Sequence, residues 1–281
     1  MCYRLSMKYV DAHAHVQFPP YDEDREEVLA HMKEKEVGAI MVGVDFESSK
    51  RAVALVEERD NLYASVGLHP NDNTTEEFDI EAYRELARHP KVVAIGECGL
   101  DYYRQEESDK ERQKELFLKH VDIATSLRKP LIIHARPTKG TQNAYQDLIA
   151  ILSKEKETHG DALWGDVHFF VGGIEEAQTL IALGFTVSFT AVLTFTKDYD
   201  ELIRSLPLSC ILSETDAPYI APEGRRGKRN DPLAVIDVAE AIARIRGEDE
   251  EMVRETLLQN AARVFKLQKA APPLSGRRFG L

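Results

Sequence analysis

The sequence contains few cysteines and no long apolar run. Its three cysteines, Cys2, Cys98 and Cys210, are far apart and odd in number, which excludes a disulfide framework and favours reduced thiols in a cytosol. No apolar run reaches the roughly 18 residues that a membrane-spanning helix requires. The N-terminal segment leads directly into a predicted strand and leaves no room for the apolar core of a signal peptide. We therefore expect a soluble, cytoplasmic protein with no membrane partner.

Positive charge is also scarce. The chain has 36 Lys and Arg against 48 Asp and Glu, which gives a formal net charge of -12. The overall field of such a chain does not attract nucleic acid, so any phosphate binding requires a local group of cations. The composition is 43% hydrophobic and 30% charged, which supplies one sizeable core and excludes a disordered chain, a collagen and a coiled coil.

Short apolar runs alternate along the chain with longer charged stretches. The apolar residues of the charged stretches recur every three or four positions, which predicts amphipathic helices, and the continuous apolar runs suit parallel strands buried on both faces. Eight strands are expected, at residues 8–15, 37–44, 61–68, 91–97, 130–135, 163–170, 184–190 and 209–215. This series predicts a single-domain α/β fold, a (β/α)8 TIM barrel over residues 1–267, followed by a flexible tail at 268–281. An open, doubly wound sheet would produce a similar alternation.

Potential metal ligands stand at the end of the first predicted strand. His13 and His15 are separated by one residue, so in a strand both imidazoles face the same side. Two neutral imidazoles on one face can reach a single divalent ion. The pair alone is weak evidence, because a His-x-His sequence also arises by chance.

Similar residues recur at the ends of later predicted strands. Glu97 ends the fourth strand, His134 the fifth and His168 the sixth, and Glu214 and Asp216 follow the eighth. In a parallel barrel these ends meet at one face. Desolvating so many polar side chains without a partner would cost on the order of several kcal/mol each. Divalent metal ions remove that cost by coordination, so the whole series predicts a metal site.

An ordered series of motifs resembles the TatD-type metal-dependent hydrolases of the amidohydrolase-like superfamily, commonly described as TatD deoxyribonucleases. The resemblance extends from about residue 8 to residue 267. Its motifs are DAHAH (11–15), VGLHP (66–70), GECGLDYYR (96–104), IIHAR (132–136), HFFVGGIEEA (168–177), SETDAPYIAP (213–222), RGKRNDP (226–232) and NAARVF (260–265). The family's metal ligands carry over onto His13, His15, Glu97, His134, His168 and Asp216. The resemblance thus implies a metal-dependent hydrolase.

The ligand set implies a two-metal mechanism. Glu97 would bridge two divalent ions (Zn, Mn or Mg), since each carboxylate oxygen can bind one metal. His13 and His15 would hold the first ion with Asp216, and His134 and His168 the second. Glu97 and Asp216 are therefore the candidate catalytic residues, with Asp216 as the base that accepts the proton of the attacking water.

The candidate substrate is DNA, short or single-stranded and approached from a 3′ or 5′ end, with no obligate protein partner. Four cations lie within five residues after the eighth strand, and such a cluster can hold phosphates. A solvated loop whose cations offset nearby acids is the alternative. The residues expected to bind substrate are His69, Tyr102, Arg136, Arg229 and Asn230. Lys139 follows Arg136, and Tyr102 or Tyr103 could stack on a base.

Three departures from the family pattern leave the substrate open. Gln17 follows Val16, a longer loop begins at Pro137, and bulky residues occupy 169–171. One alternative is therefore hydrolysis of an acyl ester, amide or lactone at the same site. Another is a metal-binding scaffold without catalysis. Glu97 stands where barrel amidohydrolases often carry a modified Lys, which favours the TatD-like interpretation.

Overall fold

The computed structural model describes residues 7–71, 75–103 and 107–267. Eight parallel strands form one sheet in chain order, each hydrogen-bonded to the next. The strands are β1 (Tyr9–Ala14), β2 (Val37–Val42), β3 (Leu62–Val66), β4 (Val92–Asp101), β5 (Leu131–Arg136), β6 (Gly165–Val167), β7 (Phe185–Phe189) and β8 (Ile211–Ser213). All eight predicted strands are therefore present, although β4 runs four residues past its predicted end at residue 97.

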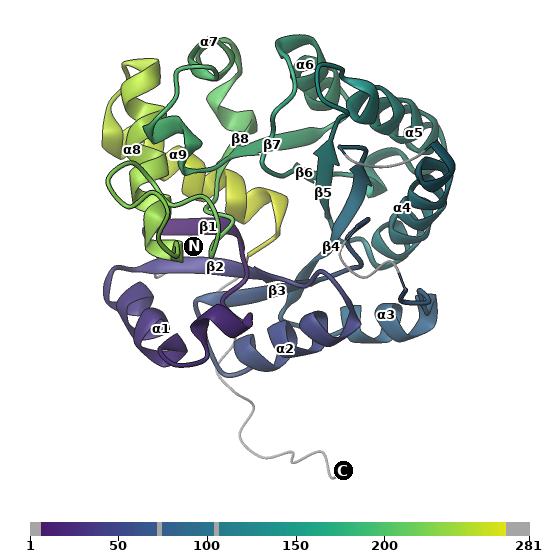
Figure 1. Ribbon diagram of the computed structural model, residues 1–281, viewed down its shortest axis with the longest axis horizontal. Coiled ribbons are helices and arrows are strands. Elements are labelled where there is room, and N and C mark those ends of the chain that lie inside the picture. Colours follow the sequence, from purple (N-terminus) through teal and green to yellow (C-terminus); the bar gives the residue numbers. More distant parts are fainter. Residues whose placement is uncertain (1–6, 72–74, 104–106, 268–281) are drawn as a thin grey trace.

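Helices surround the ring of strands (Figure 1). They are α1 (Arg25–Glu34), α2 (Phe46–Val56), α3 (Ile80–Ala87), α4 (Glu107–Leu127), α5 (Asn143–His159), α6 (Ile174–Ala182), α7 (Asp200–Ser205), α8 (Val235–Arg246) and α9 (Glu250–Val264). No helix in the described ranges combines the length and the apolar character needed to cross a bilayer. The tail predicted at 268–281 lies outside the described residues.

Hydrogen bonds between β1 and the segment after β8 close the sheet. The backbone N–H of Asp216 donates to the carbonyl of His13 at 2.9 Å, and that of His15 donates to the carbonyl of Ala217 at 2.8 Å. Ala14 and Ala217 form a parallel bridge at the same point. The closure confirms the (β/α)8 barrel over the open sheet, and it places Asp216 beside His13 of β1 and His15, which follows β1.

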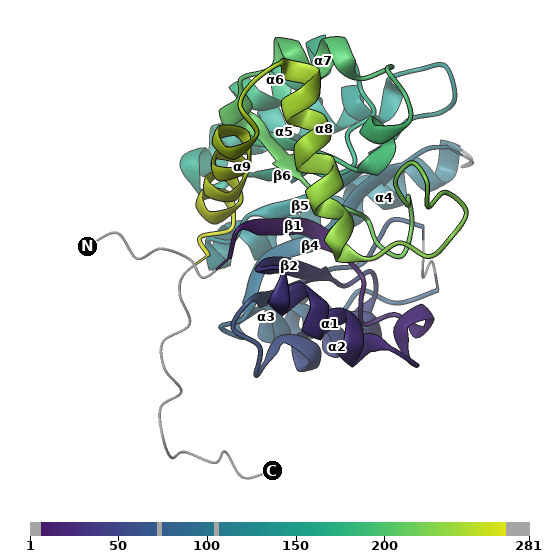
Figure 2. The same cartoon turned by 90° about the vertical axis from the view of Figure 1, so that its left-hand side faces the viewer.

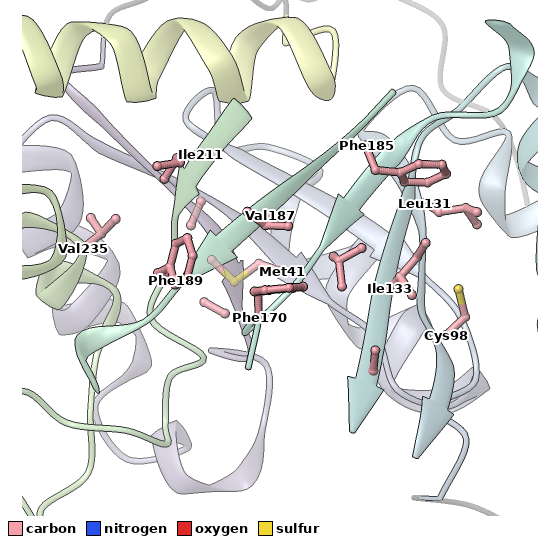
Figure 3. Close-up of a cluster of buried hydrophobic side chains, with 14 of the residues drawn as sticks. Met41, Cys98, Leu131, Ile133, Phe170, Phe185, Val187, Phe189, Ile211 and Val235 are labelled. Atoms are coloured by element: carbon pink, nitrogen blue, oxygen red, sulfur yellow. The ribbon is translucent and has the colours of Figure 1, made fainter. Parts of the chain in front are cut away.

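Two apolar layers hold the barrel together. The outer layer lies between strands and helices, and Figure 3 shows Ile133, Val187 and Phe189 among its members. The inner layer fills the end of the barrel that α9 covers, and it includes residues of the last turn of α9. Figure 2 shows α9 on one side of the barrel and the loop after β8 on the other. Because α9 covers one end, the cavities that follow the strands open at the opposite end.

Irregular pairing in β1 and β4 turns extra residues toward the barrel interior. Between Asp11 and Ala14, β1 spans three positions while β2 spans two. In β4 the same mismatch lies between Ile95 and Cys98, opposite β5. An extra residue of this kind is a β-bulge, which re-aims the side chains around it. Beyond the bulge Cys98 returns to the outer layer.

Gly96 allows the bulge of β4. Its φ is +144°, and an added Cβ would lie 2.3 Å from the backbone oxygen of Ile132 on β5. We predict that Gly96→Ala lowers the free energy of unfolding by about 3 kcal/mol or more, because backbone strain and a clash with immobile backbone add together. Urea unfolding followed by circular dichroism measures this change.

Gly247→Ala is the matched control. Gly247 has φ +67° at the end of α8, but nothing lies within 4 Å of its added Cβ. It should lose only about 1–2 kcal/mol from backbone strain. Equal losses in the two variants would show that the close approach of β5 to Gly96 adds nothing to the cost of backbone strain.

Candidate metal centre

The loops at the carboxyl ends of the strands enclose a cavity of about 690 Å³, here called the central cavity. Its lining is polar on one side and aromatic or aliphatic on the other. The lining residues are His15, Phe18, Val44, His69, Asn71, Glu97, Asp101, His134, Ala135, Arg136, His168, Phe169, Val171, Asp216, Tyr219 and Ile220. Active sites of (β/α)8 barrels lie at this end, which makes the cavity the candidate functional site.

Four side-chain atoms from the end of β1, from β4 and from the loop after β8 (residues 214–231, the β8 loop) lie close together, and all but that of His13 belong to residues that line this cavity. His13 Nε2 lies 3.1 Å from His15 Nε2 and 3.3 Å from Glu97 Oε2. Asp216 Oδ1 lies 3.5 Å from His15 Nε2 and 3.9 Å from His13 Nε2. Ligands about 2.0–2.1 Å from a tetrahedral ion are about 3.3 Å from one another. The spacing of these four atoms fits a single divalent ion.

The second oxygen of Glu97 faces a separate group of histidines. Its Oε1 lies 3.0 Å from His168 Nε2, 3.1 Å from His134 Nδ1 and 3.6 Å from His69 Nε2. One carboxylate therefore faces two sets of ligand atoms, one on each oxygen. This is the arrangement expected of a residue shared between two ions. His69, expected from the sequence to contact substrate, lies in the second group.

The hydrogen bonds of the ring nitrogens agree with metal binding. His15 Nδ1–H donates to the carbonyl of Val42 at 2.7 Å, and His168 Nδ1–H donates to Glu214 Oε1 at 3.2 Å. In the neutral ring, each bond places the hydrogen on Nδ1 and leaves the lone pair of Nε2 available to a metal ion. His13 Nδ1 is buried without a hydrogen-bond partner among the described residues. His13 Nε2 lies 3.1 Å from His15 Nε2, and either a hydrogen bond between them or a shared cation can occupy this contact, depending on the tautomer of His13.

Electrostatics keep the shared carboxylate ionised. Burial by itself raises the pKa of Glu97, but the charges of His168 and His13 outweigh it and hold that pKa well below the usual value. Burial lowers the pKa of His168, but Glu214 and Glu97 raise that pKa by more than burial lowers it, so the net shift is well upward. Glu97 and His168 therefore stabilise each other's charged forms, whereas burial lowers the pKa of His13.

A buried polar chain supports His168 from inside the barrel. Glu214 accepts from His168 through one oxygen and from the Ser188 hydroxyl, at 2.9 Å, through the other. Ser188 Oγ also lies 2.6 Å from Asp166 Oδ2, and because its single hydrogen is donated to Glu214, it accepts here from Asp166 in the protonated form. Asp166 Oδ1 accepts from Thr186 at 2.6 Å. Burial, together with the nearby Glu214 charge, raises the pKa of Asp166 to about 7. Of these four residues, only Glu214 was expected from the sequence. The other three could have been noticed only as polar residues inside apolar strands.

Asp101 at the end of β4 is a second residue that the sequence analysis missed. Its Oδ2 lies 3.1 Å from His134 Nε2, and its Oδ1 accepts from the backbone N–H of Tyr103 at 3.0 Å. It borders the central cavity. The available signal was its place four residues after Glu97, but the sequence assigned it beyond the end of the strand. The bulge lengthens β4 and brings Asp101 beside His134.

Three non-glycine residues of the cavity wall have left-handed backbone conformations. The φ values are +44° for Phe169, +55° for Asp216 and +51° for Ile220. Each such conformation costs on the order of 1–3 kcal/mol and tends to occur at functional sites. Two of these residues directly follow or supply a candidate ligand, which indicates that ligand placement outweighs local backbone preference here.

Two of the residues expected to bind substrate, Tyr102 and Asn230, are buried in the structure. Tyr102 is only 1% exposed and its hydroxyl donates to Asp147 at 3.0 Å, so the expectation that its ring stacks on a base is wrong. Asn230 is 0% exposed, and its amide donates to the carbonyl of Ile220 at 3.1 Å. Asn230 therefore fixes the β8 loop. Tyr219, 54% exposed on the cavity rim, is the aromatic that the sequence analysis did not select.

The cations of the β8 loop are largely engaged with the protein itself. Arg229 forms two hydrogen bonds to Asp24, at 2.8 and 2.5 Å, and covers the ring of Tyr21. Arg225 pairs with Asp231 and Asp237. These contacts match the alternative of a loop whose cations offset nearby acids. Of the expected substrate-binding cations, Arg136 is the one that borders the central cavity.

Comparisons with known proteins agree with this geometry. The family model described as TatD related DNase matches residues 10–266. The chain belongs to the TatD-related DNase family. An uncharacterized metal-dependent hydrolase of Bacillus subtilis, YabD, is 38% identical over 262 residues, covering 92% of this chain and 98% of YabD. This member of the TatD-related family is accordingly a metal-dependent hydrolase.

Two further relatives extend the comparison. A putative deoxyribonuclease TATDN1 homolog of Encephalitozoon cuniculi is 31% identical over 256 residues, covering 85% of this chain and 88% of that protein. The crystal structure of YjjV, a TatD homolog from Escherichia coli, superposes with a TM-score of 0.83 at 28% identity, over 93% of this chain and 99% of that one. The TatD-related barrel thus extends over nearly the whole chain.

Removal of the Glu97 carboxylate tests the two ligand groups. We predict that wild-type protein, loaded with Zn or Mn and desalted, retains about two ions per chain, and that Glu97→Ala loses most of both because its two oxygens face both groups. Inductively coupled plasma mass spectrometry measures the metal content. Glu85→Ala, which removes an exposed carboxylate paired with Arg88, is the control and should retain the wild-type content. Full retention of metal by Glu97→Ala would contradict the shared role.

Proposed function

We propose that the protein is a metal-dependent deoxyribonuclease that cleaves phosphodiester bonds from a DNA strand end. The observation that carries this proposal is the position of Glu97, whose two oxygens face two separate histidine groups in one open cavity. The family model and the relative described as a putative deoxyribonuclease support the choice of DNA.

The proposed ligand assignment follows the two groups. His13, His15 and Asp216 would hold one divalent ion and His134 and His168 the other, with Glu97 shared. His69 lies close enough to the second group to contribute. Mixed nitrogen and oxygen donors suit Zn or Mn, and Mg where water supplies the remaining ligands. The bound ions would supply an acidified water and neutralise the non-bridging oxygens of a phosphodiester.

Asp216 is the proposed general base. Its carboxylate borders the central cavity, and its Oδ1 lies within 4 Å of His13 Nε2 and of His15 Nε2. The closing hydrogen bond from its backbone N–H to His13 fixes its position relative to them. A carboxylate held beside the reacting water can accept its proton as the water attacks phosphorus.

The rest of the central cavity suits a nucleotide. Arg136 offers a guanidinium to a phosphate, and Tyr219 offers an exposed ring on which a base can stack. Cations are few at this mouth in a chain of net charge -12. The substrate proposed is therefore a short or single-stranded DNA end, which needs fewer phosphate contacts than a long duplex.

Hydrolysis of end-labelled single-stranded DNA in the presence of Mg or Mn tests the function. Wild type should release nucleotides, and Asp216→Asn should lower kcat by about 100-fold or more because the proton acceptor is lost. Asp161→Asn removes an exposed acid at the opposite end of α5 and should keep wild-type activity. Metal content is measured for both variants, which separates loss of an ion from loss of the base.

The same preparation is assayed on acyl ester, amide and lactone substrates. Hydrolysis of these substrates with no cleavage of DNA would overturn the deoxyribonuclease proposal and support hydrolysis of an acyl ester, amide or lactone at the same site. Bound metal with no hydrolysis of any substrate would support a metal-binding scaffold. Wild-type DNA cleavage by Asp216→Asn with full metal content would overturn the base role of Asp216.

A further inference from the structure

A second cavity, here called the loop cavity, lies beside the central cavity. It measures about 600 Å³ and is formed mainly by the connection between β5 and α5. Its lining residues are Tyr103, Arg136, Pro137, Thr138, Lys139, Gly140, Thr141, Gln142, Gln146, Val171 and Glu176. Arg136 and Val171 also line the central cavity. The two cavities are therefore adjacent and share part of their walls.

The charge of the loop cavity favours an anion. Arg136 and Lys139 both line it, and neither forms an ion pair with a carboxylate within the described ranges. Several cations at the mouth of the barrel are neutralised instead, as Arg112 is by Asp109 and Arg229 by Asp24. The single acid in the lining, Glu176, accepts from the backbone N–H of Gly173 at 3.1 Å and so caps α6.

The wall of the loop cavity is ordered in advance of any ligand. The guanidinium of Arg136 lies 4.0 Å from the ring centre of Tyr103. Thr138 donates its backbone N–H to Asn143 Oδ1 at 3.0 Å and its hydroxyl to the carbonyl of Tyr102 at 3.0 Å. A second bond joins the Asn143 amide to the Thr138 hydroxyl. Fixing the guanidinium of Arg136 and the loop at Thr138 before binding reduces the entropy lost on binding.

Neutral polar groups complete the lining. Gln142, Gln146 and Thr141 bring amides and a hydroxyl to the same cavity, and the side-chain oxygen of Gln142 is buried without a partner. Such groups can bond the sugar and base of a nucleotide whose phosphate lies on the cations. A compact anion such as orthophosphate would leave most of a 600 Å³ cavity unfilled.

We propose that the loop cavity is a subsite for the nucleotide adjacent to the one at the metal centre, with Arg136 and Lys139 holding its phosphate. This proposal rests on the proposed function, since it assumes a nucleic-acid substrate. It makes the preferred substrate a single-stranded oligonucleotide in place of an isolated nucleotide ester. It also makes Lys139 a residue that determines specificity, because Lys139 borders only the loop cavity.

Two substrates separate the subsite from the chemistry. One is a fluorescein-labelled single-stranded DNA oligonucleotide, which would reach both cavities. The other is the p-nitrophenyl ester of thymidine 5′-monophosphate, which has one phosphodiester and would occupy only the central cavity. Lys139→Gln should raise KM for the oligonucleotide about fivefold with little change in kcat, and should leave both constants for the small ester unchanged. Lys154→Gln, an exposed lysine of α5 that borders neither cavity, should match wild type on both substrates.

Direct binding gives a readout that needs no hydrolysis. Fluorescence anisotropy of the same oligonucleotide should show about fivefold weaker binding to Lys139→Gln than to wild type or Lys154→Gln. The slope of log affinity against log salt concentration should fall by about 0.7, as expected for one lost contact to a single-stranded phosphate.

The outcomes distinguish the two proposals. If wild type hydrolyses the small ester and Lys139→Gln binds and cleaves the oligonucleotide as wild type does, the subsite proposal is overturned and the proposed function stands. If neither substrate is hydrolysed but Lys139→Gln weakens oligonucleotide binding selectively, the subsite is supported and the proposed function fails. An equal rise in KM for both substrates would place Lys139 at the central cavity and overturn the subsite.

Discussion

The structure of this site depends on the burial of one carboxylate. Glu97 is only 4% exposed, and an ionised carboxylate removed from water is strongly destabilising unless positive groups surround it. Histidines from four different parts of the chain supply that surrounding, at the ends of β1, β3, β5 and β6. Their side chains in turn need partners, which the polar chain behind His168 and the carboxylate of Asp101 provide.

Backbone irregularity makes this arrangement possible. A regular β4 that places Ile95 in the outer layer would also turn Glu97 outward, whereas the extra residue between Ile95 and Cys98 lets Glu97 face the cavity and returns Cys98 to the outer layer. The hydrogen bonds that close the barrel at β1 also position Asp216 against His13. The same hydrogen bonds therefore close the barrel and position this candidate ligand. The left-handed backbone of Asp216 is tolerated because both ends of that turn are held.

Charge is distributed unevenly over the mouth of the barrel. The β8 loop has the highest density of cations, yet Arg229 is held by Asp24, a residue about two hundred positions away in the sequence. Fewer cations lie at the end of β5 and in the loop that follows it. Of these, Arg136 and Lys139 line cavities, and neither has a carboxylate partner among the described residues. Affinity for a polyanion depends on such uncompensated charge more than on the number of basic residues. The local field at the mouth therefore differs from that of the acidic chain as a whole.

The sequence by itself determined the order of strands and the residues at their ends, because apolar periodicity and the spacing of His13 and His15 are local properties. It also determined that the acids and histidines would meet, since parallel strands of a barrel end at one face. It did not determine the burial of Tyr102 or the pairing of Arg229, because both depend on residues distant in the chain. Nor did it reveal Asp166 and Asp101, whose partners are set by sheet register and a bulge. Tertiary structure alone decided which polar groups are satisfied within the protein and which remain to meet a ligand, since that depends on three-dimensional proximity and exclusion of water.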